Sequence, residues 1–334
     1  MRPLGPDGTG AWAVTGARVT RTGKSLAIGV GDGASDGRPA YVPALGVWDP
    51  SAALRWDQPP TEACGCLGVL ATRYSFGGYW HWLFEGLAHV VRLDDLGLLA
   101  SLDRLVICVD QTPPPRAVHE SLERTGIASS RVTVTSTPFD GVADELVVPM
   151  RAPGSGGLID ETDVRSTLRE AKVRNARYGN HADIREVRRR LGLDGSRGRG
   201  TRRLFVSRRD AAKRRVVNED ALTSALRGLG FEVVVPGALS FSEQVEAFSE
   251  AEIVVGPHGA GLANALFMPE GSAMLELHHP DFGKPYYRRL AATLDIHYRG
   301  LACEPAPTSA ADMVAAVDQA TEMVRQLLTQ IKHV

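Results

Sequence analysis

The clearest hydrophobic pattern in the chain is a short apolar run at residues 253–256, which predicts a buried parallel strand. Pro257 ends this run, and the small residues after it form a tight turn. Residues 262–268 then predict a helix, and residues 273–277 predict a second strand. A strand that leads through such a turn into a helix presents free N–H groups and a positive dipole end, where phosphate can bind. Close packing of helix on strand would explain the same glycines.

Strand and helix patterns also alternate on both sides of this stretch. Strands are expected at residues 203–207, 231–235 and 296–301, and helices at residues 218–229, 240–251, 285–294 and 313–331. Asn218 stands where the first of these helices needs an N-cap. Ser240 and Glu243 have the spacing of a capping box. The second half of the chain therefore predicts a doubly wound α/β domain.

The first half has a similar, less regular alternation. Strands are expected at residues 66–72, 105–110, 131–135 and 145–149, and helices at residues 79–93 and 114–124. Residues 12–14 and 41–48 have the composition of edge strands in a small antiparallel layer. This alternation predicts a second α/β domain, which ends near Met150.

The length of 334 residues favours two domains rather than one. We expect an N-terminal α/β domain on the acceptor side at residues 1–155, and a polar helical bridge and Gly/Arg-rich linker at residues 156–200. A nucleotide-binding domain is expected at residues 201–304, followed by a C-terminal helical segment at residues 305–334. The predicted fold class is α/β, with two facing Rossmann-like domains closed by the C-terminal helix.

The composition is typical of a globular protein, with 43% hydrophobic and 23% charged residues. A net charge of −1 gives the whole molecule no general attraction to nucleic acid or to an anionic membrane. No apolar run approaches the roughly 18 residues that span a bilayer, and residues 1–16 lack the apolar core of a signal peptide. We therefore expect a cytoplasmic protein, with peripheral membrane association left open. The four cysteines are too scattered for a disulfide scaffold or a zinc site, and are expected to be reduced and buried.

Thirteen arginine and lysine residues gather between residues 185 and 215. They could form a nucleic-acid patch, but the aromatic residues that stack on bases are missing, since only Phe205 occurs there. A solvated basic surface is the second interpretation. The third concerns Arg208, which follows a strand, and Arg214, which precedes a helix. Ligands of open α/β sheets bind at such positions, and guanidinium groups suit a diphosphate.

Three polar residues between residues 253 and 277 are further candidates for binding a ligand. His258 lies in the turn and either shapes the loop or contacts a donor phosphate or sugar. Asn264 lies one turn into the predicted helix and either caps it or touches a base. Glu276, near the carboxyl end of a strand, either accepts hydrogen bonds from ribose hydroxyls or pairs within the fold.

In the first half, His81, Glu85 and His89 share one face of a predicted helix at a spacing of four. The order of these residues is not the His-Glu-x-x-His zinc pattern. His81 or Glu85 could instead take a proton from an acceptor hydroxyl, as a general base does. No Asp-x-Asp pair occurs in the chain. Charge on a leaving diphosphate would then be met by arginines and a helix N-terminus, without a metal or another cofactor.

Two ordered groups of motifs resemble glycosyltransferase family 61. One runs through Ser207-Arg-Arg, then Lys213-Arg-Arg-Val-Val-Asn-Glu219, then Gly256-Pro-His-Gly-Ala-Gly-Leu262 and its continuation to Pro269. The other, Tyr79-Trp-His-Trp-Leu-Phe-Glu85, is similar to the N-terminal motif of that family. The resemblance extends from about residue 77 to residue 277.

The resemblance implies a GT-B-like fold and an inverting transfer of a sugar from a nucleotide-diphosphate donor, expected to be a UDP-sugar, to a hydroxyl of a glycan or small molecule. The implied donor-binding residues are Arg208, Arg214, Asn218, His258, Gly259, Ala260, Gly261, Asn264 and Glu276. His81 and Glu85 are the implied catalytic residues. An RNA-binding protein that uses residues 185–215 is one alternative, and a Rossmann-type oxidoreductase is another. No Gly-x-Gly-x-x-Gly opens either half.

Overall fold

The computed structural model describes residues 2–4, 11–22, 25–30, 60–70, 78–109, 111–127, 129–137, 139–149, 181–193, 200–281, 285–307 and 309–332. The expected strand at residues 41–48, most of the helical bridge and residues 194–199 of the linker lie outside these ranges. The chain divides into two compact units, a first unit at Met1–Arg190 and a second unit at Leu191–Val334.

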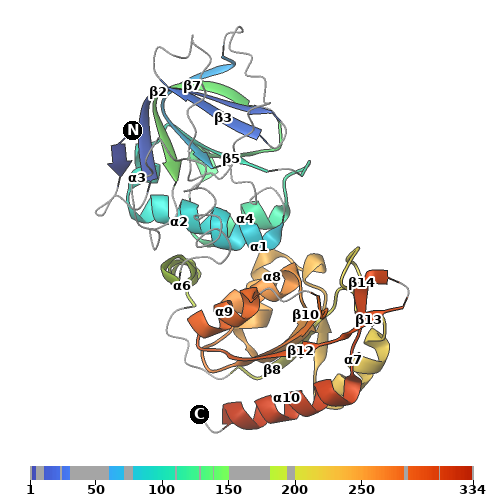
Figure 1. The fold of residues 1–334 in the computed structure, drawn as a ribbon. Coiled ribbons are helices and arrows are strands. Elements are labelled where there is room, and N and C mark those ends of the chain that lie inside the picture. The colour runs from blue at the N-terminus through green and yellow to red at the C-terminus, as the bar shows by residue number, and fades with distance from the viewer. Residues whose placement is uncertain are drawn as a thin grey trace, which may run out of the picture. The chain divides into compact units, whose positions relative to one another are not determined.

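A seven-stranded sheet forms the centre of the first unit (Figure 1). Its strands are β1 (Arg2–Leu4), β2 (Ala11–Thr22), β3 (Ser25–Val30), β4 (Glu62–Leu70), β5 (Arg104–Cys108), β6 (Val132–Thr135) and β7 (Phe139–Pro149). The order is β1-β2-β7-β4-β5-β6, with β3 paired to β2. Strands β7, β4, β5 and β6 run parallel, whereas β2 is antiparallel to β1, β3 and β7.

The strand expected at residues 12–14 is confirmed as part of β2, whose pairing with β1, β3 and β7 is antiparallel as expected, but it lies within the seven-stranded sheet rather than in a small layer. The alternate positions Ala11, Ala13, Ala17 and Val19 are buried. Three of these four residues are alanines, which are depleted in strands. The hydrophobic alternation of β2 is therefore too weak to show its full length in the sequence.

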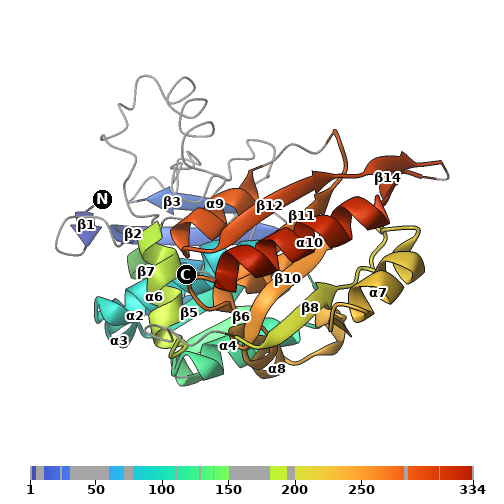
Figure 2. The same ribbon diagram turned by 90° about the horizontal axis from the view of Figure 1, so that it is seen from below.

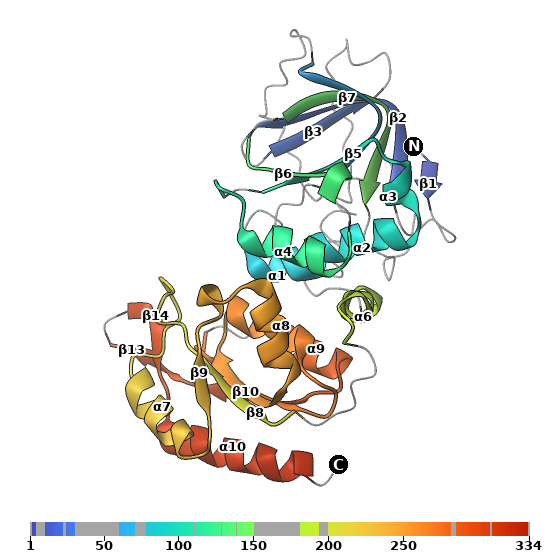
Figure 3. The ribbon, with the colours of Figure 1, turned by 180° about the vertical axis from the view of Figure 1, so that it is seen from behind.

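Helices lie on one side of this sheet (Figures 1 and 3). They are α1 (Tyr79–His81), a π-helical turn η3 (Trp82–Leu87), α2 (Ala88–Asp95), α3 (Leu98–Ser101) and α4 (Arg116–Arg124). A short 3₁₀ turn, η4 (Ser129–Arg131), comes before β6. Helix α6 (His181–Arg190) packs beside α2. The helix expected at residues 79–93 is thus present, with a π-helical centre that the sequence did not indicate. Trp82 fixes this centre, since its indole N–H donates to the buried hydroxyl of Ser121 at 2.8 Å.

The second unit has a five-stranded parallel sheet in the order β12-β11-β10-β8-β9. Its strands are β8 (Arg202–Val206), β9 (Glu232–Val234), β10 (Ala251–Pro257), β11 (Ala273–His278) and β12 (His297–Ala302). Its helical segments are α7 (Glu219–Arg227), η5 (Pro236–Ala238), α8 (Phe241–Ser249), η6 (Ala260–Phe267), α9 (Tyr286–Thr293) and α10 (Val317–Lys332). Helices α7 and α10 cover one face and α8 and α9 the other (Figure 3), which is the doubly wound arrangement expected for this half.

The C-terminal helix packs on the sheet of its own unit (Figure 2). Its buried residues Val324, Leu327 and Ile331 join one apolar core with residues of β8, β10 and β11. This helix begins at Val317, not at residue 313 as expected. Residues 304–306 and 309–314 form instead an antiparallel pair of strands, β13 (Glu304–Ala306) and β14 (Ser309–Val314). Closure of the two domains by α10 stays a prediction.

The helix ends of the second unit test the expected caps. The capping box of α8 is confirmed, because Ser240 and Glu243 each bond the other's backbone N–H. Asn218 precedes α7, but its side chain makes no capping bond. The segment after the small-residue turn is a 3₁₀ helix, η6, rather than the α-helix expected there.

Candidate nucleotide-binding site

The parallel sheet of the second unit reverses its strand order between β8 and β10. From β8 the chain moves outward to β9, and it then returns to β10 on the other side of β8. Open α/β sheets bind ligands in the crevice at the carboxyl ends of the two strands that flank such a reversal. Arg208 follows β8 by two residues, and His258 and Gly259 directly follow β10. The candidate residues from two separate motifs therefore meet at the one edge where the topology favours a ligand.

Arg208 lies directly against Gly259. A Cβ atom added at residue 259 would overlap the guanidinium of Arg208, so this packing requires glycine. Arg208 donates from Nη2 to the carbonyl of Lys213 at 3.2 Å, while its Nε is buried and has no hydrogen-bond partner among the described residues. Burial lowers the pKa of Arg208, and the neighbouring charge of Arg214 lowers that pKa further. A half-buried guanidinium with an unused donor next to a second cation is suited to bind an anion.

Arg214, whose charge acts on Arg208, has an unusual backbone conformation. Its φ of 60° is in the left-handed region, which a residue with a side chain rarely adopts. Such a conformation costs on the order of 1–3 kcal/mol and persists where the surrounding structure holds it. The N–H of Arg214 donates to the carbonyl of Ala311 in β14 at 3.0 Å. The structure thus brings together the two arginines that the sequence selected, which lie six positions apart in the chain.

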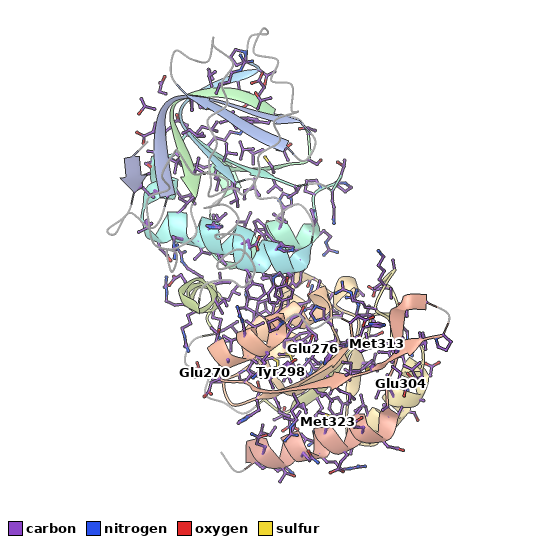
Figure 4. The ribbon with its side chains drawn as sticks, viewed as in Figure 1. Glu270, Glu276, Tyr298, Glu304, Met313 and Met323 are labelled. Atoms are coloured by element: carbon purple, nitrogen blue, oxygen red, sulfur yellow. The ribbon has the colours of Figure 1, made fainter. Side chains whose placement is uncertain are left out.

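His258 is buried and is held by a carboxylate. Its Nδ1 contacts Glu276 on β11, whose other oxygen accepts a hydrogen bond from the hydroxyl of Tyr298 on β12 at 2.6 Å (Figure 4). An ionised carboxylate only accepts hydrogen bonds, so we assign a proton to Nδ1 of His258. Burial, together with the negative charge of Glu276, raises the pKa of Tyr298. This assignment fixes the orientation of the imidazole ring of His258.

The geometry changes the expected role of Glu276. A ribose contact needs a carboxylate that a ligand can reach, but Glu276 is 2% exposed and both of its oxygens accept from protein groups. Its neighbours in the sheet register are Gly256 on β10 and Gly300 on β12. A Cβ at Gly300 would lie 3.0 Å from the hydroxyl of Tyr298, so this glycine leaves room for that side chain, whereas a Cβ at Gly256 would meet Val206 and Leu262. Glu276 is therefore an internal partner of His258 and not the ribose ligand that we expected.

Two asparagines are also internal. Asn264 is fully buried, and its amide donates to Gln244 of α8 at 2.8 Å, so the expected contact with a base is not supported. Asn218 donates to the carbonyl of Ala315 at 2.8 Å and accepts from the N–H of Ala315 at 2.9 Å. This pair of bonds ties the start of α7 to the segment after β14, and the donor-binding role of Asn218 stays a prediction.

The remaining residues of the turn are Ala260, which is partly exposed, and Gly261, which is partly exposed and also closely packed. Ala260 and Gly261 are half-exposed at the start of η6, where the first N–H groups of a helix have no partner within the helix. A Cβ at Gly261 would lie 2.9 Å from Val206 and 3.3 Å from Pro236. Close packing, the alternative explanation of these glycines, thus holds at Gly261.

The sequence missed Tyr287, in the first turn of α9. Its hydroxyl donates to the carbonyl of Gly259, and its ring lies 5.1 Å from that of His258 in an edge-to-face arrangement. Burial and the charge of Glu276 raise the pKa of Tyr287. Its position after the carboxyl end of β11 is the only signal that could have identified it, because the loops at this edge of a parallel sheet surround the ligand.

In the first unit, the structure brings together His81 and Glu85. Nδ1 of His81 lies 3.3 Å from a carboxylate oxygen of Glu85, which is 3% exposed within the π-helical turn. Nδ1 of His89 contacts the backbone carbonyl of Glu85 rather than its carboxylate. Within the described ranges, no three His, Cys, Asp or Glu side chains gather as a metal would require. A π-helical turn is frequent at functional sites, which keeps this pair of residues as a candidate.

Most described arginines of the basic segment are paired with carboxylates. Arg190 pairs with Asp94 and Asp95, and Arg203 pairs with Glu252. Arg189, Arg202, Arg209 and Arg215 also have acidic partners. Such pairing reduces the positive field that a nucleic-acid surface needs.

The sequence model of the family described as Glycosyltransferase 61 matches residues 79–275, more than half of the chain. An "EGF domain-specific O-linked N-acetylglucosamine transferase" from Mus musculus is 34% identical over 104 residues, which are 30% of this chain and 20% of that protein. A "Beta-1,2-xylosyltransferase" from Arabidopsis thaliana is 25% identical over 89 residues, 27% of this chain and 16% of that protein. The chain thus spans about a fifth or less of the length of these relatives. No helix in the described residues is both long and apolar enough to cross a membrane.

Proposed function

Because the chain belongs to the glycosyltransferase 61 family, we propose that it transfers a sugar from a nucleoside-diphosphate donor, a UDP-sugar, to a hydroxyl of a glycan or small-molecule acceptor with inversion. The observation that carries this proposal is the contact of Arg208 with Gly259 at the reversal of the parallel sheet. This contact places an unused guanidinium donor where open α/β sheets bind phosphate.

The proposed diphosphate site has three parts. Arg208 and Arg214 provide two guanidinium groups, which stay charged at any physiological pH. The first N–H groups of η6 provide further donors. Negative charge grows on the leaving diphosphate as the bond to the sugar breaks, so fixed positive groups stabilise the transition state more than the bound donor.

We place His258 beside this diphosphate. With Nδ1 held by Glu276, the imidazole ring is oriented in a single direction, from which it would contact a phosphate oxygen or the sugar. The hydrogen bond from Tyr298 and the ring contact with Tyr287 fix the histidine further. Its alternative function is that of the base that takes the acceptor proton.

The acceptor side is assigned to the first unit. His81 and Glu85 form a close pair on the π-helical turn, and one of them would remove the proton from the acceptor hydroxyl. This assignment requires a GT-B-like arrangement in which the two units face each other across the substrates. The reaction would need neither a metal nor another cofactor, and a cytoplasmic location remains part of the proposal.

A thermal-shift screen tests the donor class. UDP, UDP-N-acetylglucosamine and UDP-xylose are the first probes, since the names of the relatives include these two sugars. A ligand at 100 times its Kd stabilises a protein by about 2.7 kcal/mol. We expect stabilisation by UDP and by one UDP-sugar. Stabilisation by NAD alone would favour the oxidoreductase, and a salt-sensitive shift with RNA alone would favour the RNA-binding alternative.

A further inference from the structure

The loop that carries both proposed phosphate arginines is attached to β14. The N–H of Arg214 donates to Ala311, and the N–H of Met313 donates to the carbonyl of Arg215 at 2.9 Å. The N–H of Val217 donates to the carbonyl of Met313 at 2.9 Å, so the loop forms a β-bridge with β14 at Val216. Met313, which takes part in two of these bonds, is labelled in Figure 4. The strand pair β13–β14 lies beyond residue 275, where the match to the family ends.

Asp312 is the buried centre of the attachment. Its side chain is 1% exposed and accepts three hydrogen bonds from Arg215: from the backbone N–H at 3.0 Å, from Nε at 3.1 Å and from Nη2 at 2.8 Å. A buried carboxylate with three donors from one residue fixes both the backbone and the side chain of that residue. The residue so fixed is the direct neighbour of Arg214.

The loop contains two Arg-Arg pairs, Arg208-Arg209 and Arg214-Arg215, whose members have similar partners. In the first pair, Arg209 donates to the buried Glu219 at 2.6 Å, while Arg208 lies against Gly259. In the second pair, Arg215 is held by Asp312 and Arg214 adopts the left-handed conformation. In each pair the second arginine is tied to a buried carboxylate, and the first lies next to the proposed phosphate site.

We propose that Asp312 is a positioning residue, which holds Arg215 and β14 in the arrangement that keeps Arg214 beside Arg208 for binding of the donor diphosphate. The inference rests on the proposed function of the arginine pair. Asp312 makes no contact with the donor in this scheme, because it is buried behind Arg215. Its removal should act through Arg214 alone.

The test uses the full chain and measures the Kd of UDP by calorimetry, the KM of the donor and kcat at saturating donor. In Asp312→Asn we expect UDP affinity to fall about tenfold, as is typical for a group behind a ligand-binding side chain. We expect kcat at saturating donor to fall as well, because the displaced Arg214 also loses its stronger interaction with the leaving diphosphate in the transition state. Arg215→Ala opens the same ion pair at a half-exposed position and should reproduce the effect if Asp312→Asn does not fold.

Glu252→Gln is the matched control. It breaks the ion pair with Arg203 near the amino ends of β8 and β10, away from the proposed site. This variant should lose stability without losing UDP affinity. An equal loss of affinity in the control would show a general effect of instability and overturn the proposal.

The Arg214→Ala background separates this inference from the proposed function. If Arg214→Ala binds UDP like the wild type, the proposed diphosphate site is wrong. If Arg214→Ala weakens binding and Asp312→Asn does not, only the positioning role is wrong. If Asp312→Asn weakens binding by the same factor with and without Arg214, it acts by another route and the inference fails.

Discussion

At residue 259 the side chain is a single hydrogen atom, and the guanidinium of Arg208 occupies the space that a Cβ would fill. Without this glycine, the guanidinium of Arg208 would have to move away from the turn that follows β10. The sequence selected Gly259 as part of a phosphate-binding turn, and the structure adds this second reason for it. The absence of a side chain at Gly259 therefore allows Arg208, fifty-one positions earlier in the chain, to lie against the turn.

We predict that Gly259→Ala lowers UDP affinity about as much as Arg208→Ala does. A charge-assisted hydrogen bond contributes about 1.5–3 kcal/mol, so the Kd should rise roughly ten- to a hundredfold in each variant. Calorimetric titration with UDP provides the measurement. Gly228→Ala, where the nearest atom would lie 3.2 Å from the new Cβ, and Arg202→Ala are the matched controls. Wild-type affinity in both Gly259→Ala and Arg208→Ala would remove these residues from the site.

Polar residues at this edge show what a sequence can and cannot predict about a site. Arg208 and Arg214 were selected because each lies close to the end of a predicted element, and in the structure the charge of Arg214 lies close enough to act on Arg208. Glu276 and Asn264 were placed near the ligand on the same argument, but they are buried and paired within the protein. Sequence position gives the end of a strand, whereas the direction of a side chain depends on partners such as Tyr298, which come from distant parts of the chain.

Among the elements, those with continuous apolar runs were the most predictable. β10 and β11 are buried along almost their whole lengths, and their sequences indicate this without help from other segments. β14, with the sequence Ser-Ala-Ala-Asp-Met-Val, has no such pattern and was assigned in part to the last helix. It exists because it pairs with β13 and with the arginine loop, two contacts that only the folded chain provides.

We predict that Asp312 makes the attachment of the arginine loop sensitive to acid. In the folded protein, hydrogen bonds from the backbone N–H and the guanidinium of Arg215 hold the pKa of Asp312 below its ordinary value of 3.8. A lowered carboxyl pKa adds stability that is present above the unfolded pKa and is lost as the pH falls through the folded value. The free energy of unfolding should therefore be higher for the wild type than for Asp312→Asn at pH 7, and this difference should shrink below about pH 4. Urea unfolding at pH 7 and pH 3 measures it, and a difference that is the same at both pH values would contradict the prediction.

For the whole molecule, the family was predictable from the order of its motifs, and the match to residues 79–275 confirms it. The division into units falls between residues 190 and 191, inside the segment expected to form a bridge. The acceptor was not predictable, since the residues that select it act through the shape of a pocket rather than through a motif. The same holds for the donor sugar, because a diphosphate site is indifferent to the sugar that it carries.

We predict that the activity survives chelation of metals. Two arginines and the N–H groups of η6 supply the positive charge that a divalent cation would otherwise bring to a diphosphate. Turnover in excess EDTA should equal turnover in buffer alone, measured as release of UDP. Loss of turnover with EDTA and its recovery with manganese or magnesium would show that a metal takes part, and His81, Glu85 and His89 would be the first residues to test as ligands.

The last prediction separates the two units by function. If the second unit holds the donor and the first unit acts on the acceptor, then His81→Ala or Glu85→Gln should lower turnover while the Kd of UDP stays unchanged. Loss of a general base costs about 10²- to 10⁴-fold in rate, and a group that acts only in the transition state lowers kcat without changing donor binding. Glu85 is buried, so the thermal unfolding midpoint of each variant must accompany the kinetics. The matched control is His119→Ala on α4, an exposed histidine of the same unit that should keep full turnover. Near-normal turnover in both variants would transfer the role of base to His258, and a parallel fall in UDP affinity would place the π-helical turn in the donor site instead.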